Sequence, residues 1–192
     1  MRVDDNLAPQ NGRSKKIVVV AHCILNQNSR VQGLAKFKGT ITPIVEILTK
    51  SGVGIIQMPC PEFLYMGYKR WAQTKEQYDI TPYRRLCRKI AKQIGSQIHE
   101  YAKNGVEIAA ILGIEGSPTC AVTKTTKGYT GGDPTKIQNQ KGEKIREKGI
   151  LIEELEKILT KMKIKTRLIG INNRAPEKAT AEIREILQQA KW

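Results

Sequence analysis

Three cysteines in this sequence come shortly after apolar runs of the kind that form buried strands. They are Cys23 after residues 17–21, Cys60 after residues 53–58, and Cys120 in the turn that follows residues 106–114. Because the carboxyl ends of parallel strands lie at one edge of a sheet, we expect the three thiols to converge there. Thiolates select zinc, copper(I) and iron–sulfur clusters, and three ligands would leave one metal position open for a small molecule.

Polar side chains near these cysteines could transfer protons and bind a substrate. Glu62 is two residues from Cys60 and could activate water as a general base, while Ser117 could orient water or substrate by hydrogen bonding. Asn26 and Arg30 follow the first of the three cysteines and could contact the polar edge of a base. The alternative for Glu62 is a surface carboxylate or a helix-cap partner, and for Asn26 and Arg30 a plain turn or surface role.

The other cysteine and the two histidines are interpreted as structural. Cys87 lies on the apolar stripe of a predicted helix and is expected in the core. His22 precedes Cys23, so strand alternation would direct it to the opposite side, and His99 is expected to be exposed on a basic helix. A cysteine nucleophile is a further alternative, but no histidine is placed to pair obviously with Cys60.

The elements that must position these residues alternate along the chain. Apolar, β-branched runs predict buried strands over residues 17–21, 53–58, 106–114 and 166–171. Apolar residues spaced by three and four predict helices over residues 42–50, 81–104, 150–161 and 175–190. This order predicts an α/β fold: a single-domain, Rossmann-like three-layer sandwich with a mostly parallel sheet of about four strands.

The remaining segments have no clear periodicity. Residues 63–80 are predicted to form an irregular loop with one short helix, and residues 121–142 a glycine- and lysine-rich loop. Within that loop, Gly128 to Pro134 could act as a flexible lid. Residues 1–14 are polar and are expected to form a mobile arm, which leaves residues 15–192 as the domain that carries the site.

Charge and composition limit the class of protein and its partners. A formal net charge of +15 favours acidic partners, with RNA as one possibility, although a solvated lysine-rich surface would give the same count. No apolar stretch approaches the roughly 18 residues of a membrane span, and nothing at the N-terminus resembles a signal peptide. We therefore expect a cytoplasmic protein with reduced thiols and no membrane partner.

The three cysteine segments together resemble a known family. Cys23-Ile24-Leu25-Asn26 after a first strand, Cys60-Pro61-Glu62 after a second and Ser117-Pro118-Thr119-Cys120 after a third are similar to the small cytosolic proteins that include the bacterial thiouracil desulfurases. The resemblance extends from about Ile17 to Cys120. The chain differs from that pattern at Thr119, where a second serine is common, and at residues 63–67, where a glycine-rich stretch is common.

The resemblance implies a 4Fe-4S cluster held by Cys23, Cys60 and Cys120, with Glu62 and Ser117 handling substrate and protons. It implies a desulfidase that removes sulfur from a thiolated small molecule without redox change, replacing C=S by C=O at the open iron. The alternative cofactor is zinc. The alternative functions are a metal- or cluster-containing binding protein for thiolated RNA or another anionic ligand, and a cluster-free protein whose cysteines only fill space.

Overall fold

A four-stranded parallel sheet forms the centre of the computed structural model, which describes residues 12–132 and 142–189. The strands stand in the order β2-β1-β3-β6, and each pairs in parallel with its neighbour. They are β1 (Lys16–Ala21), β2 (Gly54–Met58), β3 (Glu107–Ile114) and β6 (Arg167–Ile171). The predicted α/β fold with a four-stranded parallel sheet is confirmed. The expected N-terminal arm, residues 1–14, lies outside the described residues except for its last three.

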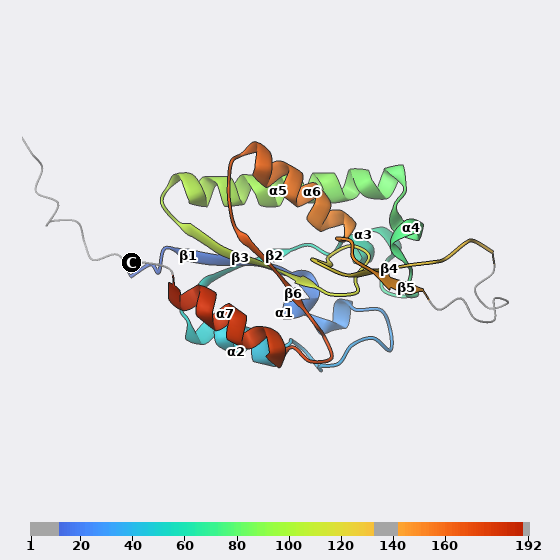
Figure 1. Ribbon diagram of the computed structural model, residues 1–192, viewed down its shortest axis with the longest axis horizontal. Helices are drawn as coiled ribbons and strands as arrows, with labels where there is room; N and C mark the ends of the chain where they lie inside the picture. The colour runs from blue at the N-terminus through green and yellow to red at the C-terminus, as the bar shows by residue number, and fades with distance from the viewer. Residues whose placement is uncertain (1–11, 133–141, 190–192) are drawn as a thin grey trace, which may run out of the picture.

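Helices cover both faces of this sheet, which gives the three layers seen in Figure 1. On one face lie α5 (Thr81–Lys103) and α6 (Ile150–Lys161), and on the other α2 (Thr42–Lys50) and α7 (Glu177–Gln189). All six residues of β1 are buried, as a central strand covered on both sides requires. No helix in the described ranges combines the length and apolar character needed to cross a membrane.

The longest helix, α5, packs its apolar stripe into the core. Cys87 on that stripe is fully buried, which confirms its predicted core position, and His99 is exposed as expected. Gly95 lets α5 approach α6 closely, because a Cβ atom there would lie 2.6 Å from Cγ2 of Ile158.

The second strand differs from the prediction. Residues 53–58 are predicted to form a buried parallel strand, but β2 is an edge strand, and Ile55 and Gln57 on it are exposed. The apolar run is real, yet composition alone does not tell an edge strand from a central one.

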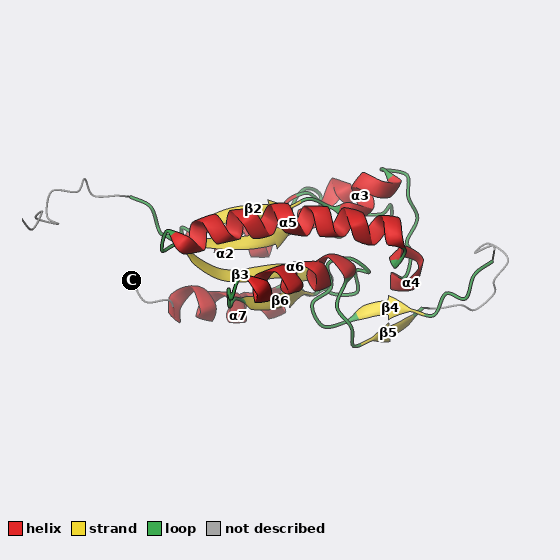
Figure 2. Cartoon of the chain, turned by 90° about the horizontal axis from the view of Figure 1, so that it is seen from above, coloured by secondary structure: helices red, strands yellow, loops and turns green. Residues whose placement is uncertain are grey.

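Short elements that the sequence did not predict surround the carboxyl edge of the sheet. Cys23 lies in the single turn α1 (His22–Leu25), which a 3-10 turn, η2 (Gln27–Ser29), follows. The segment 63–80 holds parts of two short helices rather than one, α3 (Pro61–Met66) and α4 (Lys75–Tyr78). The glycine-rich segment contributes β4 (Thr125–Lys127), which pairs antiparallel with β5 (Glu143–Ile145) in a separate hairpin at one end of the molecule (Figure 2).

The strand order places the site. The chain moves from β1 to β2 on one side, then returns to β3 on the other side of β1. In doubly wound sheets, ligands bind outside the carboxyl ends of the strands where the order reverses in this way. Here that point lies between β1 and β3, and Cys23, Cys60 and Cys120 follow the three strands around it.

Candidate functional site

The three predicted cysteines border one cavity at the carboxyl edge of the sheet. Its volume is about 1070 Å³, and Glu62, Ser117, Arg30 and Arg70 are among the side chains that line it with Cys23, Cys60 and Cys120. Cys23 and Cys60 are half-buried, and Cys120 is 8% exposed. The structure therefore brings together six of the seven residues that the sequence predicted for the site.

Each cysteine is held by its local backbone. The carbonyl of Cys23 accepts a hydrogen bond of 2.5 Å from the side-chain amide of Gln27. Cys60 is the residue that precedes α3, and its carbonyl accepts the first backbone bond of that helix, from Leu64, at 3.1 Å. Proline at the first position of α3 fixes the chain direction there without losing a hydrogen bond.

The Cys120 segment is fixed by close backbone contacts. Ser117 Oγ accepts hydrogen bonds from the backbone N–H of Thr119 at 3.1 Å and of Cys120 at 3.0 Å. Two glycines make room for this segment: a Cβ atom on Gly113 would lie 2.2 Å from the carbonyl oxygen of Cys120, and one on Gly149 would lie 2.3 Å from the carbonyl carbon of Thr119. The position of this thiol therefore depends on glycine at both sites.

The thiols are electrostatically linked and strongly desolvated. Burial raises the pKa of Cys23, raises that of Cys60 to about 12, and raises that of Cys120 well above its usual value. Negative charge on Cys23 would raise the pKa of Cys60, and charge on either of these two would raise that of Cys120. A raised pKa disfavours the thiolate that a cysteine nucleophile needs, whereas a bound cation would favour it.

Glu62 is held between a hydroxyl and a guanidinium. Ser117 Oγ donates to one carboxylate oxygen of Glu62 at 3.2 Å, and Arg70 Nε lies 3.7 Å from the other. The side chain of Arg70 is 2% exposed, and its two Nη groups donate to the carbonyl oxygens of Ser29 at 2.6 Å and Gly67 at 3.2 Å. The same serine thus links the carboxylate to the Cys120 turn. Glu62 is neither a free surface carboxylate nor the acceptor of a helix-capping bond.

Sequence reasoning missed Arg70. It lies in a segment without periodicity, where an arginine is ordinarily exposed. Only the fold shows that its guanidinium is enclosed by α3, by η2 and by the carboxylate of Glu62. No local sequence signal would have found it.

Arg30 brings a second guanidinium to the cysteines. Its Nη1 lies 3.7 Å from Sγ of Cys23 and lowers the pKa of that thiol, although burial raises it more. Its Nε is buried without a hydrogen-bond partner within the described part of the chain. Positive charge close to the sulfur favours an anionic group at this end of the cavity.

Asn26 and His22 differ in place from what the sequence suggested. Asn26 does not line the main cavity. Its side-chain oxygen accepts from the backbone N–H of Asn28 at 3.1 Å, and it borders a second, apolar cavity of about 490 Å³ that Cys60 also lines. Its role in substrate binding stays a prediction. His22 borders the same cavity as Cys23, contrary to the expectation from strand alternation, because the strand ends at Ala21 and a helical turn begins.

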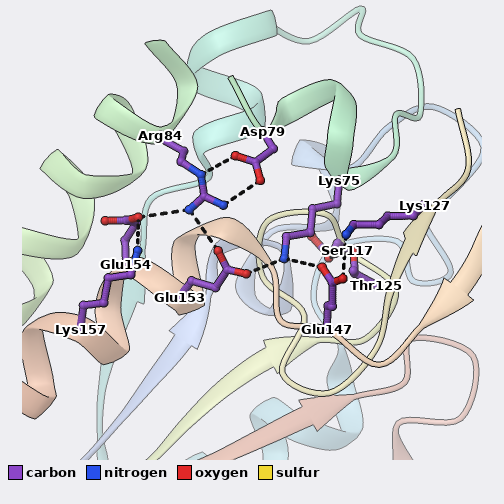
Figure 3. A network of polar contacts seen from close by, with 10 residues as sticks. All are labelled: Lys75, Asp79, Arg84, Ser117, Thr125, Lys127, Glu147, Glu153, Glu154 and Lys157. Atoms are coloured by element: carbon purple, nitrogen blue, oxygen red, sulfur yellow. Dashed lines mark hydrogen bonds and ion pairs between the residues drawn. The ribbon is translucent and has the colours of Figure 1, made fainter. Parts of the chain in front are cut away.

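The glycine-rich segment reaches the cavity only in part. Tyr129 lines the cavity, and its backbone N–H donates to Glu76 on α4 at 2.7 Å. Residues 133 and 134 lie outside the described residues, so the predicted lid at Gly128 to Pro134 stays a prediction. On the same side, Thr125 of β4 donates to the carbonyl of Ser117 at 3.0 Å (Figure 3).

Comparison with known proteins decides the family. The model of a family described as "Putative 2-thiouracil desulfurase" matches residues 15–167, which include all three cysteines, Glu62 and Ser117. The chain belongs to this 2-thiouracil desulfurase family. A similar curated protein, an uncharacterized protein of Methanocaldococcus jannaschii, is 46% identical over 112 residues, which cover 58% of this chain and 71% of the relative. No solved structure matches the chain significantly.

The residues of this family member can be tested against the cofactor that the resemblance implies. Within residues 12–132 and 142–189, no group of three or more His, Cys, Asp or Glu side chains lies close enough to hold a single metal ion. Three ligands of one zinc ion, each at about 2.3 Å, would lie within about 4 Å of one another. A four-iron cluster is larger and is held at its corners. Cys23, Cys60 and Cys120 border one cavity and are the donor type that iron–sulfur clusters and zinc use, and Arg30 Nη1 lies 3.7 Å from Sγ of Cys23. The choice between a cluster and zinc stays a prediction.

Proposed function

We propose that this 2-thiouracil desulfurase family member removes sulfur from a thiolated small molecule, such as a thiouracil-like base. The reaction is hydrolytic: the C=S bond is replaced by C=O, water supplies the oxygen, and the sulfur leaves as hydrogen sulfide with no net oxidation or reduction. The observation that carries the proposal is that Cys23, Cys60 and Cys120 border the same cavity as the linked pair of Glu62 and Ser117.

The cysteines are the ligands in this proposal, and the group they hold is a 4Fe-4S cluster. When bound, such a cluster supplies an open iron, which acts as a Lewis acid toward the thiocarbonyl sulfur. The third thiol, Cys120, is held by the same serine that orients Glu62, so ligand and carboxylate share one support.

Glu62 takes the proton from the attacking water. Its carboxylate is already fixed by two contacts, so little reorganisation is needed when water binds between it and the substrate carbon. Ser117 orients the carboxylate, and Arg70 holds the other oxygen, which limits the carboxylate to one direction of proton transfer. Arg30 lies beside Cys23 and provides positive charge for the sulfur that is released.

The decisive experiment combines metal analysis with sulfide release. Protein purified or reconstituted without oxygen should be brown, with about four irons and an equal amount of sulfide for each chain. Cys60→Ser should lose iron, whereas Cys87→Ser, which changes a cysteine buried in the core, should keep it. Zinc without iron would contradict the cluster and favour the alternative metal.

Glu62→Gln separates the metal site from the catalysis. This variant should keep the absorption spectrum and iron content of the unaltered protein and lose sulfide release from 2-thiouracil or a related thiolated base. Full activity in Glu62→Gln would remove this residue from the mechanism. An iron-loaded protein that releases no sulfide from any thiolated base would favour a binding role instead.

A further inference from the structure

Among the described helices, α5 has the largest excess of positive over negative side chains. α5 carries six arginine or lysine residues and a single acidic residue, Glu100. The helices of the opposite face, α2 and α7, together carry three basic and four acidic residues. Charge that serves only solubility would be distributed more evenly between the two faces of the molecule. The excess of basic residues on α5 therefore indicates a partner on that side.

Six of the exposed residues of α5 lie along one side of the helix. Arg85, Lys89, Lys92, Ser96, His99 and Lys103 are all exposed and are spaced by three and four residues, so they follow one side of the helix. From the rise of a helix, this α5 stripe is about 27 Å long. Figure 2 views the molecule from the side on which α5 lies uncovered along its length.

Three cations of the α5 stripe are not neutralised. Arg85, Lys89 and Lys92 have no ion pair within the part of the chain that the structure describes. Their neighbours differ: Arg84 contacts Asp79, Glu153 and Glu154 (Figure 3), and Arg88 contacts Glu154 at 3.1 Å. Carboxylates of α6 therefore compensate Arg84 and Arg88, while Arg85, Lys89 and Lys92 are left for an external anion.

The chemistry of the stripe indicates what that anion is. It contains no apolar side chain, and the apolar stripe of α5 is buried in the core, so the helix cannot insert into a membrane. Successive cations one helical turn apart suit a chain of phosphates, which binds through such charges without regard to sequence. Few aromatic residues lie on the helix surface, so the contact is with the backbone rather than with bases.

We propose that the α5 stripe binds the phosphate backbone of RNA. The helix begins beside the cysteine cavity, because Tyr83 on its first turns shares a hydrogen bond of 2.7 Å with Thr119, the neighbour of Cys120. RNA on the stripe would therefore have one end near the cavity. The choice of RNA over DNA rests on the proposed function, since thiolated bases are constituents of RNA.

The test measures binding of the full chain to a fluorescein-labelled, single-stranded RNA of about 20 nucleotides without thiolated bases, at several salt concentrations. The variant is the triple change Arg85→Gln, Lys89→Gln and Lys92→Gln. The matched control is Lys50→Gln, Lys178→Gln and Arg184→Gln, which removes the same charge from exposed positions on α2 and α7. Melting temperatures check that both triple variants fold.

The α5 variant should lose at least about tenfold in affinity, and the slope of log affinity against log salt should fall in magnitude by about 2, since each phosphate contact on a single strand contributes about 0.7. The control should stay close to the unaltered protein. Equal losses in both variants, no binding of RNA by the unaltered chain, or tighter binding to DNA of the same length or to phosphatidylserine vesicles would each overturn the proposal.

Sulfide release from a free thiolated base distinguishes this proposal from the proposed function. The α5 variant should keep that activity, because none of its three substitutions lies in the cavity. RNA binding that depends on the stripe in a protein that releases no sulfide would leave the docking surface standing and contradict the enzyme.

Discussion

Arg70 and Glu62 form a pair in which each side chain depends on the other. Arg70 is enclosed, its Nη groups are satisfied by backbone carbonyls, and its remaining Nε lies 3.7 Å from the carboxylate. Removing one partner of a buried ion pair leaves the other uncompensated, which is more costly than removing both. The pair therefore couples the stability of the fold to the position of the carboxylate proposed to act on water.

Arg70→Met should lower the free energy of unfolding by about 3 to 5 kcal/mol, because it leaves Glu62 buried without a cation. Urea unfolding measures this directly. In a Glu62→Gln background, Arg70→Met should lower the free energy of unfolding by clearly less, since no carboxylate is then left unpaired. The control, Arg85→Met on the exposed face of α5, should change the unfolding free energy by no more than about 0.5 kcal/mol. Equal costs in both backgrounds would show that Arg70 acts only through its backbone contacts.

At the scale of elements, the turn that carries Cys120 is confined between β3 and α6. Gly113 on β3 and Gly149, which precedes α6, both lie against the backbone of this turn. A side chain at either position would displace the peptide groups around the thiol. The two glycines thus set where the third cysteine stands relative to the other two.

Gly113→Ala should reduce the iron bound per chain and lower stability by about 1 to 3 kcal/mol, the usual cost of overpacking. The methyl group would meet the carbonyl oxygen of Cys120 and cannot be accommodated by a side-chain rotation. Gly39→Ala is the matched control, since a methyl group there meets no atom within 4 Å among the described residues. Iron analysis and urea unfolding of the two variants decide the point, and full iron loading in Gly113→Ala would contradict it.

The elements that the sequence predicted are those with a strong pattern. The four parallel strands and the four long helices follow from apolar runs and from helical spacing, and with them the convergence of Cys23, Cys60 and Cys120. The edge position of β2 and the burial of Arg70 could not be predicted, because both depend on which segments pack beside them. The β4–β5 hairpin has only three residues in each strand, too few for alternation to be recognised.

At the scale of the whole molecule, a network of ion pairs joins α4 to α5, α6 and the β4–β5 hairpin (Figure 3). Its innermost carboxylate is Glu154, whose side chain is 4% exposed and which contacts Arg84, Arg88 and Lys157. Burial alone would raise the pKa of Glu154, but hydrogen bonds from Lys157 and Arg88 lower it below its usual value.

A carboxylate whose pKa is lowered by folding stabilises the protein above its unfolded pKa of about 4.3, and this stability is lost as pH falls through the folded value. We therefore expect the free energy of unfolding to fall between about pH 5 and pH 3, with a slope of up to about 1.4 kcal/mol per pH unit for each such proton. Urea unfolding at several pH values measures it.

Glu154→Gln should be less stable than the unaltered protein at pH 7 and should show a shallower dependence on pH over that range. Glu46→Gln, which changes an exposed carboxylate of α2, serves as the comparison. If the free energy of unfolding depends on pH in the same way in Glu154→Gln and in the unaltered protein, protonation of Glu154 is not the cause of the loss of stability in acid.

The separation of the three cysteines along the chain has a consequence for biosynthesis. Cys120 is synthesised after Cys23 and Cys60, and in the folded chain its turn follows β3, which pairs with β1, and lies against Gly149. A nascent chain that ends before this point offers at most two ligands in place. If the three cysteines hold the proposed cluster, its assembly would be a late event, and the brown colour of a cluster would report that synthesis and folding of the whole sheet are complete.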